Sequence, residues 1–265
     1  MAVDGTRPET RVAIDAVERG LELARSRAGA GDITSKGDRD LVTATDIAVE
    51  DMVRDIVSAL SFPVVGEERG GDMPVDGSPF WFLDPICGTR NFASGIPLYC
   101  VNLALVEGDE VTVSVVGDAS TDEIHIAERG RGARASAHGE HRPLVASEES
   151  RTIAIEPGHS SGGRREHAAR FTGEAIREDH WDVRNLSSTL SLPYVAAGRV
   201  AAYVLFAAPT LHCAAGTLLV TEAGATLSDI DGQPWTLRSD SLVASATPDL
   251  HRELLNRAQA TKPSR

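Results

Sequence analysis

The residue types best able to do chemistry gather in a few short segments. Carboxylates occur in "GEE" (66–68) and at Asp84, and Cys87 follows Asp84 in "DPICGT". His212 begins the segment "HCAAG". Carboxylates bind hard cations, whereas a thiol with an imidazole and a carboxylate either binds zinc or acts as nucleophile, base and orienting acid. These segments therefore point to metal-dependent catalysis or to cysteine-based catalysis.

Apolar residues at helical spacing predict two helices ahead of these segments, over residues 9–29 and 45–60. Asp46 stands at the start of the second helix, where a short acidic side chain can cap free N–H groups. Short apolar runs at 62–68 and 79–85 then predict buried strands. Each acidic segment is therefore expected at the end of a strand.

The remainder of the chain divides into two halves. Residues 99–120 are typical of a β-hairpin that turns at a Gly-Asp pair, whereas later segments alternate strands with helices. The polar stretch 135–150 separates the halves. We therefore expect an α/β (α+β) protein. Its N-terminal α+β subdomain, 1–145, carries GEE and DPICGT, and its C-terminal α/β subdomain, 146–265, carries HCAAG.

Composition and charge narrow the classes of function. The chain has 265 residues, of which 42% are hydrophobic and 25% charged, as in ordinary soluble proteins. Its net charge of −13 argues against nucleic acid or anionic membrane as a partner, because both attract positive surfaces. We find no signal-peptide core, no run near the roughly 20 apolar residues of a membrane span, and no paired pattern among three cysteines. A cytoplasmic protein with reduced thiols is expected.

Four segments together resemble the inositol monophosphatase family of metal-dependent phosphatases. They are "DLVTATDIAVED" (40–51), "GEE" (66–68), "DPICGTRNFASGIP" (84–97) and "HCAAGTLLVTEAGA" (212–225), in the order and spacing of the family. The corresponding family patterns include GEE, DPIDGTxNFxxGxP and WDxAAGxxxxxEAGG. The resemblance implies an αβαβα layered sandwich and a homodimer.

The resemblance also implies a metal site, in which two ligands have changed. For one Mg²⁺ ion the family ligands correspond to Glu67, Asp84 and the carbonyl of Ile86, all of which are present. The next ion is held in the family by both aspartates of DPIDGT and the aspartate of WDxAAG. Cys87 and His212 stand at two of those three positions. Because Mg²⁺ prefers oxygen ligands in octahedral geometry, the second site is altered.

Other family positions concern water and substrate. Asp46 and Thr89, which in the family help to position the attacking water, are retained. The position of a family glutamate that binds substrate hydroxyls corresponds to Leu205, and the family's GSA-type loop reads "SSTL" from Ser187 and Ser188. An apolar substrate would be favoured, because removing apolar area from water gains about 25 cal/mol per Å².

Three interpretations of Cys87 and His212 stay open. In a decayed phosphatase, Cys87 is only a small buried hydrophobe. With a changed metal, Asp84, Cys87 and His212 form a zinc-binding set that leaves one position open. In nucleophilic catalysis, His212 activates the thiol while Asp84 or Asp118 orients the imidazole.

Of these, nucleophilic catalysis is favoured, because both changes fall on the ligands of one ion and introduce a nucleophile and a base. Backbone N–H groups at Gly88 and Thr89 would stabilise an oxyanion, and no metal cofactor would be required. The chain then resembles phosphatase-like proteins thought to act as Dieckmann cyclases in tetramate and pyridone antibiotic pathways. It is expected to cyclise and release a β-ketoacyl thioester from an acyl or peptidyl carrier protein, with Cys87 taking the acyl chain.

The alternative is a metal-dependent phosphatase. It would use Mg²⁺ or Zn²⁺ at Glu67, Asp84, Ile86, Cys87 and His212 to hydrolyse an inositol or sugar phosphate as a small-molecule substrate. A catalytically silent member of the family is the remaining reading. The two enzyme readings differ in whether a metal is required.

Overall fold

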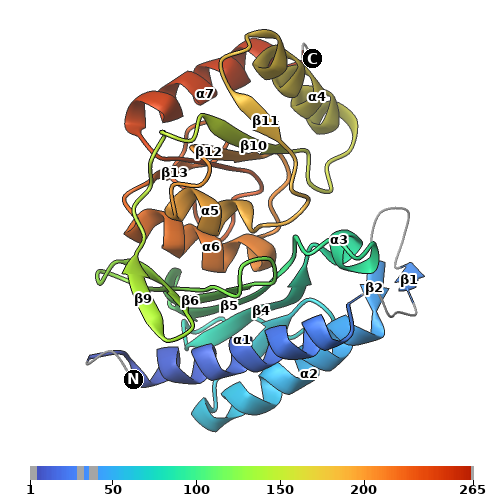
Figure 1. The fold of residues 1–265 in the computed structure, drawn as a ribbon, viewed down its shortest axis with the longest axis vertical. Coiled ribbons are helices and arrows are strands. Elements are labelled where there is room, and N and C mark those ends of the chain that lie inside the picture. The colour runs from blue at the N-terminus through green and yellow to red at the C-terminus, as the bar shows by residue number, and fades with distance from the viewer. Residues whose placement is uncertain (1–4, 29–32, 36–40, 264–265) are drawn as a thin grey trace.

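Five alternating layers of helices and sheets make up the fold (Figure 1). The computed structural model describes residues 5–28, 33–35 and 41–263. A seven-stranded sheet is covered on its outer face by α1 (Pro8–Ser26) and α2 (Ala44–Val57). Between it and a five-stranded sheet lie α5 (Ser191–Ala196) and α6 (Thr210–Glu222). The far face carries α4 (Gly162–Arg177) and α7 (Pro248–Thr261). The predicted αβαβα sandwich is confirmed.

The first sheet has the strand order β3-β4-β5-β6-β7-β8-β9 and is antiparallel except between β3 and β4. Its strands are β3 (Val64–Gly66), β4 (Phe80–Cys87), β5 (Cys100–Glu107), β6 (Glu110–Asp118), β7 (Ile124–Glu128), β8 (Ala133–Ala137) and β9 (Glu140–Pro143). The predicted hairpin is confirmed as β5 and β6.

The second sheet has the order β11-β10-β12-β14-β13, in which β10 is parallel to both of its neighbours. Its strands are β10 (Thr152–Glu156), β11 (Asp182–Arg184), β12 (Ala202–Leu205), β13 (Thr226–Ser228) and β14 (Leu242–Ser245). A small antiparallel sheet of β1 (Ile33–Ser35) and β2 (Leu41–Thr43) precedes α2. Two short helices, η1 (Ser58–Leu60) and α3 (Thr89–Ala93), follow α2. The boundary proposed at residue 145 lies between the sheets, and the division into subdomains stays a prediction.

The two predicted N-terminal helices form, with differences at their ends. Helix α1 begins with Pro8, which suits a first turn because it lacks an N–H group, and residue 29 lies outside the described residues. Thr43 is the N-cap residue of α2, and Asp46, three residues further on, caps a free N–H group as expected. The Thr43 hydroxyl accepts a hydrogen bond from the Asp46 N–H (3.3 Å), and Asp46 Oδ2 accepts one from the Thr43 N–H (2.8 Å). This reciprocal capping box satisfies two N–H groups.

The central layer is apolar on all sides. Every residue of α6 from Cys213 to Val220 is buried, because the helix packs on the first sheet, on α5 and on the second sheet. A helix that is hydrophobic around its whole circumference must be enclosed in this way. Even so, α6 is short, and no helix in the described ranges has the length and apolarity to span a bilayer.

Gly216 should tolerate no larger side chain, because α5 crosses α6 there. A Cβ atom at this position would lie 2.4 Å from Cδ1 of Leu192. We expect Gly216→Ala to lower the free energy of unfolding by about 1–3 kcal/mol, the usual cost of overpacking. Gly173→Ala is the matched helical control, since a Cβ there meets nothing within 4 Å. Chemical denaturation compares the two, and equal stability of both variants would contradict the packing argument.

Candidate functional site

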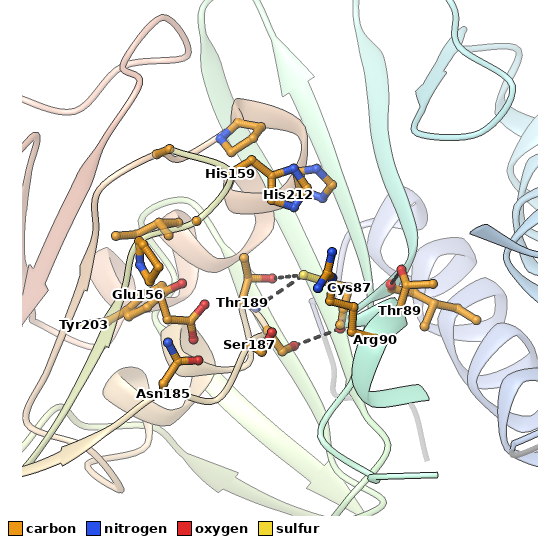
Figure 2. A pocket seen from close by; sticks show the side chains of 18 of the residues that line it. Cys87, Thr89, Arg90, Glu156, His159, Asn185, Ser187, Thr189, Tyr203 and His212 are labelled. Carbon is orange, nitrogen blue, oxygen red and sulfur yellow. Dashed lines mark hydrogen bonds between the residues drawn. The ribbon is translucent and has the colours of Figure 1, made fainter. Parts of the chain in front are cut away.

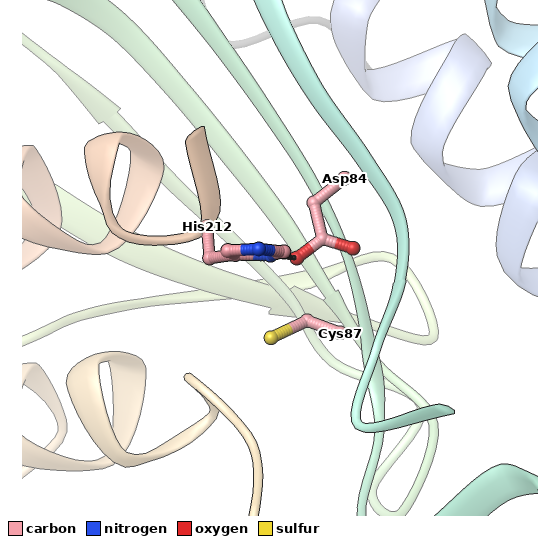
Figure 3. A group of neighbouring side chains, drawn as sticks. All are labelled: Asp84, Cys87 and His212. Atoms are coloured by element: carbon pink, nitrogen blue, oxygen red, sulfur yellow. Dashed lines mark hydrogen bonds and ion pairs between the residues drawn. The ribbon is translucent and has the colours of Figure 1, made fainter. Parts of the chain in front are cut away.

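Asp84 and Cys87 reach the same cleft because β4 is irregular between them. Asp84 is paired with Asn102 and Cys87 with Cys100, so three steps along β4 match two along β5. In a regular strand, residues three apart point to opposite faces. The irregularity, of the kind found in β-bulges, turns both side chains toward the first turn of α6 (Figure 3).

His212 enters the cleft from the first turn of α6 and binds Asp84 directly. Its Nδ1 atom lies 2.6 Å from Asp84 Oδ2 and 4.0 Å from Glu67 Oε2. Burial lowers the pKa of His212, but the charge of Asp84 and its hydrogen bond outweigh burial and raise the pKa well above its usual value. Without a bound metal, the imidazole is therefore the positive partner of Asp84.

Donor atoms of Asp84, Cys87 and His212 all lie within 4.8 Å of one another, close enough to surround one cation. The sulfur of Cys87 also accepts hydrogen bonds from the Thr189 hydroxyl (2.8 Å) and the Thr189 N–H (3.3 Å). The Ser188 hydroxyl donates to the Cys87 carbonyl (2.8 Å). The loop beginning at Ser187 thus holds the thiol in place beside the other two groups.

The acidic side of this cluster suits a cation. Burial raises the pKa of Glu67 to about 9, and the negative charge of Asp84 adds to the shift. Asp84 Oδ1 is buried and has no hydrogen-bond partner among the described residues. Because a buried, unpartnered carboxylate oxygen is costly, this atom is fitted for a metal ion.

The donor types decide which metal fits. Asp84, Cys87 and His212 offer oxygen, sulfur and nitrogen, a combination typical of Zn²⁺ and unlike the oxygen shell of Mg²⁺. Glu67, Asp84 and the Ile86 carbonyl would form an all-oxygen set beside it. The second Mg²⁺ site implied by the resemblance therefore does not fit these residues, whereas a transition metal does.

A retained pair of hydroxyl and carboxylate lies next to the cluster. Thr89 Oγ1 lies 3.0 Å from the Ile86 carbonyl oxygen and 3.4 Å from Asp46 Oδ1. Burial raises the pKa of Asp46 to about 6, although hydrogen bonds from Thr43 oppose the shift. Asp46 is still mostly ionised at pH 7, so it can accept a proton there.

Gly88, between the thiol and this pair, has a left-handed backbone with φ of 104°. A Cβ atom there would lie 2.8 Å from the Leu98 carbonyl oxygen, so the turn requires glycine. Gly88 and Thr89 both border the pocket described next.

A pocket of about 290 Å³ opens beside the cluster (Figure 2). The three residues predicted for the substrate, Leu205, Ser187 and Ser188, all line it. Sequence reasoning missed its far wall, formed by Glu156, Tyr203 and residues near them. A signal existed, because "TIAIE" is an apolar strand that ends in an acid, as do the strands leading to Glu67 and Asp84.

Asp118 does not reach His212. Strand β5 separates β6 from β4, which puts Asp118 about 10 Å from the strand of Cys87. Its carboxylate accepts hydrogen bonds from the Ser120 N–H (2.7 Å), the Ser120 hydroxyl (2.8 Å) and the Thr121 hydroxyl (2.8 Å). Asp84, the other candidate, is the carboxylate that binds the imidazole.

The thiol of Cys87 lines the pocket, but its raised pKa and its burial make it a poor nucleophile in the absence of a metal. Hydrogen bonding with Cys100, burial and the charge of Asp84 raise its pKa well above the usual value, against a smaller opposing effect of His212. The residue is 8% exposed. In EDTA we expect Cys87 to react with iodoacetamide at least about 10-fold more slowly at pH 7.5 than a cysteine in a short peptide, because the thiolate is the reactive form.

Mass spectrometry of the alkylated peptide measures this rate, and the rate should rise with pH because a raised thiol pKa leaves less thiolate near neutrality. Cys100→Ser removes one cause of the shift and should speed the reaction. Labelling of Cys87 as fast as the peptide would contradict the account.

Comparison with known proteins gives one family. A model of the "Inositol monophosphatase family" matches residues 6–262. The chain is 32% identical to inositol monophosphatase 1 of Solanum lycopersicum, covering 95% of this chain and 94% of that relative. It is also 32% identical to the Nus factor SuhB of Haemophilus influenzae, over 94% and 95% of the two chains.

Solved structures with a similar fold carry names like those of the sequence relatives. An IMPase from Thermotoga maritima superposes with a TM-score of 0.81 at 28% identity, covering 95% of this chain and 96% of that one. The suhB protein of Bartonella henselae gives a TM-score of 0.86 at 24% identity, over 96% and 99%. Because its identity is only 24%, the Bartonella henselae structure supports the fold alone.

These comparisons correct two predictions. The relatives that cover nearly the whole chain are named as inositol monophosphatases or SuhB, so the prediction of a metal-independent Dieckmann cyclase with a Cys-His-Asp acyltransferase site is wrong. The expectation that no metal cofactor is needed is wrong with it, since the family is metal-dependent and Asp84, Cys87 and His212 form a possible metal cluster. The alternative, a metal-dependent phosphatase, is the better supported reading.

Proposed function

The chain belongs to the inositol monophosphatase family, and on that premise we propose that it is a metal-dependent phosphomonoesterase with a transition metal such as Zn²⁺ at Asp84, Cys87 and His212. One observation carries the proposal: oxygen, sulfur and nitrogen donors converge within 4.8 Å at the inner end of a pocket. The relatives named as inositol monophosphatases support a small phosphate monoester as substrate.

Each residue then has a part in the reaction. When bound, the metal supplies Lewis-acid polarisation of a phosphoryl oxygen. The Thr89 hydroxyl can donate its hydrogen bond either to the Ile86 carbonyl (3.0 Å) or to Asp46 Oδ1 (3.4 Å). When it donates to Asp46, its oxygen is free to accept a hydrogen bond from the attacking water. Asp46, with a pKa of about 6, is the proton acceptor for that water through Thr89. Glu67 adds a further carboxylate beside Asp84.

Removal of the metal tests the proposal. We expect EDTA to lower phosphate release by at least about 10²-fold, because electrostatic stabilisation of the transferred phosphoryl group is lost. Zn²⁺ should restore activity better than Mg²⁺. The assay measures phosphate released from an inositol phosphate, a sugar phosphate and p-nitrophenyl phosphate, with metal content determined by mass spectrometry.

Two results would count against the proposal. Full activity in protein shown to be free of metal would refute metal dependence. Protein loaded with Zn²⁺ that releases no phosphate from any of the three esters would indicate a catalytically silent member of the family.

Two further expectations accompany the proposal. We infer a cytoplasmic location from the free cysteines Cys87, Cys100 and Cys213. A homodimer stays a prediction from the family resemblance, and sedimentation analysis measures it.

A further inference from the structure

The far wall of the pocket carries a buried carboxylate that the proposed reaction does not use. Glu156 ends β10, and the parallel pairing of β10 with β12 places it directly beside Leu205. The residue is 7% exposed and lines the pocket. Its Oε1 atom has no hydrogen-bond partner among the described residues. An unpaired polar atom at this depth is costly, so the site is built for a partner.

Tyr203 belongs to the same wall of the pocket as Glu156. The residue is fully buried and lines the pocket. Its hydroxyl has no close hydrogen-bond partner among the described residues, but it lies near enough to the Glu156 carboxylate to affect the pKa of both groups. Figure 2 shows Glu156 and Tyr203 on one side of the pocket and Cys87 with Thr89 on the other. A molecule whose phosphate lies near Cys87 and His212 would therefore extend its alcohol portion toward Glu156.

From this geometry we propose that Glu156 and Tyr203 form a specificity subsite, which hydrogen-bonds a hydroxyl or amino group on the alcohol portion of the phosphate ester. The proposal rests on the phosphomonoesterase function and names its substrate class. Leu205, beside Glu156, supplies an apolar surface. The expected alcohol thus combines an apolar frame with a hydrogen-bond donor.

The subsite calls for a donor rather than an acceptor. An ionised carboxylate only accepts hydrogen bonds. Burial raises the pKa of Glu156 to about 7. The backbone N–H groups of Ser188, Leu186 and Ser187 and the nearby Tyr203 hydroxyl oppose this shift, because they favour the ionised form. At pH 8 the carboxylate form predominates, and a substrate hydroxyl or ammonium group would meet the unpaired Oε1 atom.

The test compares esters that differ only in the donor. Cyclohexyl phosphate has none, whereas its hydroxycyclohexyl and aminocyclohexyl counterparts, substituted at each ring position in turn, carry one. In the Zn²⁺-loaded protein we expect the best donor-bearing ester to exceed cyclohexyl phosphate about 10- to 100-fold in kcat/KM at pH 8, as for hydrogen bonds to a charged group. The hydroxyl and amino series identify which donor the subsite takes.

Glu156→Gln and Tyr203→Phe keep the shapes of the side chains and should reduce this preference, toward unity for Glu156→Gln. A merely structural role would lower kcat/KM equally for all esters and leave the ratio unchanged. Glu149→Gln, at an exposed position outside the pocket, is the matched control and should keep the wild-type ratio.

Dissociation constants for the same esters in EDTA separate this proposal from the proposed function. If the wild type hydrolyses no ester but binds the donor-bearing ones more tightly, and Glu156→Gln abolishes the difference, the phosphatase reading fails and the subsite stands. A preference that persists unchanged in Glu156→Gln and Tyr203→Phe, or no preference in the wild type by either measure, overturns the subsite.

Discussion

Replacing Asp84 with asparagine is expected to lower phosphate release by about 10³-fold, the largest loss from any single substitution at the site. Asp84 is the carboxylate common to both ligand sets, and it also binds the His212 imidazole at 2.6 Å. The substitution keeps the shape but removes the charge that a metal requires. A loss of this size corresponds to about 4 kcal/mol of transition-state stabilisation, within the range for metal-ion catalysis. Phosphate release and Zn²⁺ affinity are measured on the same preparation.

Two controls show whether the loss of activity in Asp84→Asn results from misfolding. Asp55→Asn, at an exposed position on α2, is the control and should retain wild-type activity and metal affinity. Thermal unfolding in EDTA shows whether Asp84→Asn is folded. An Asp84→Asn protein that is folded, metal-free and fully active would mean that catalysis does not depend on this cluster.

The sequence motifs predicted the layers of the fold and the convergence of Asp84, Cys87 and His212. They did so because their order and spacing match a family whose fold brings these positions together. The motifs did not reveal the irregularity in β4, since it depends on how that strand pairs with β5. Without that pairing, residues three apart would be expected on opposite faces of the sheet.

The reactivity of Cys87 was misjudged because residue type alone does not define chemistry. A cysteine near a histidine and an aspartate matches the composition of a nucleophilic site. The structure adds contacts with Thr189 and a raised thiol pKa, which disfavours free attack, whereas a bound metal would lower that pKa and make the thiolate a ligand. Glu156 was missed for a related reason. It faces the pocket only through the parallel pairing that sets it beside Leu205.

Replacing Cys87 and His212 with aspartate should change the metal preference of the site from Zn²⁺ to Mg²⁺. In the double variant Cys87→Asp/His212→Asp, the sulfur and nitrogen donors are replaced by oxygen donors, which Mg²⁺ prefers and which suit Zn²⁺ less well. We expect the ratio of activity with Mg²⁺ to activity with Zn²⁺ to rise by at least about 10²-fold. The hydroxyl and N–H groups of Thr189, which now contact the sulfur, can donate to a carboxylate in its place.

The same variant should become dependent on metal for its stability. Without metal it loses the positive partner of Asp84 and gathers further negative charge beside Glu67, whose pKa is already about 9. Its melting temperature in EDTA should therefore fall below that of the wild type. Mg²⁺ at about 100 times its Kd would then stabilise it by about 2.7 kcal/mol.

The single variants Cys87→Asp and His212→Asp are the matched controls. Each should show only part of the change in the Mg²⁺/Zn²⁺ activity ratio and in the melting temperature. If the double variant instead melts as the wild type does in EDTA and gains nothing from Mg²⁺, the three positions do not surround a common ion.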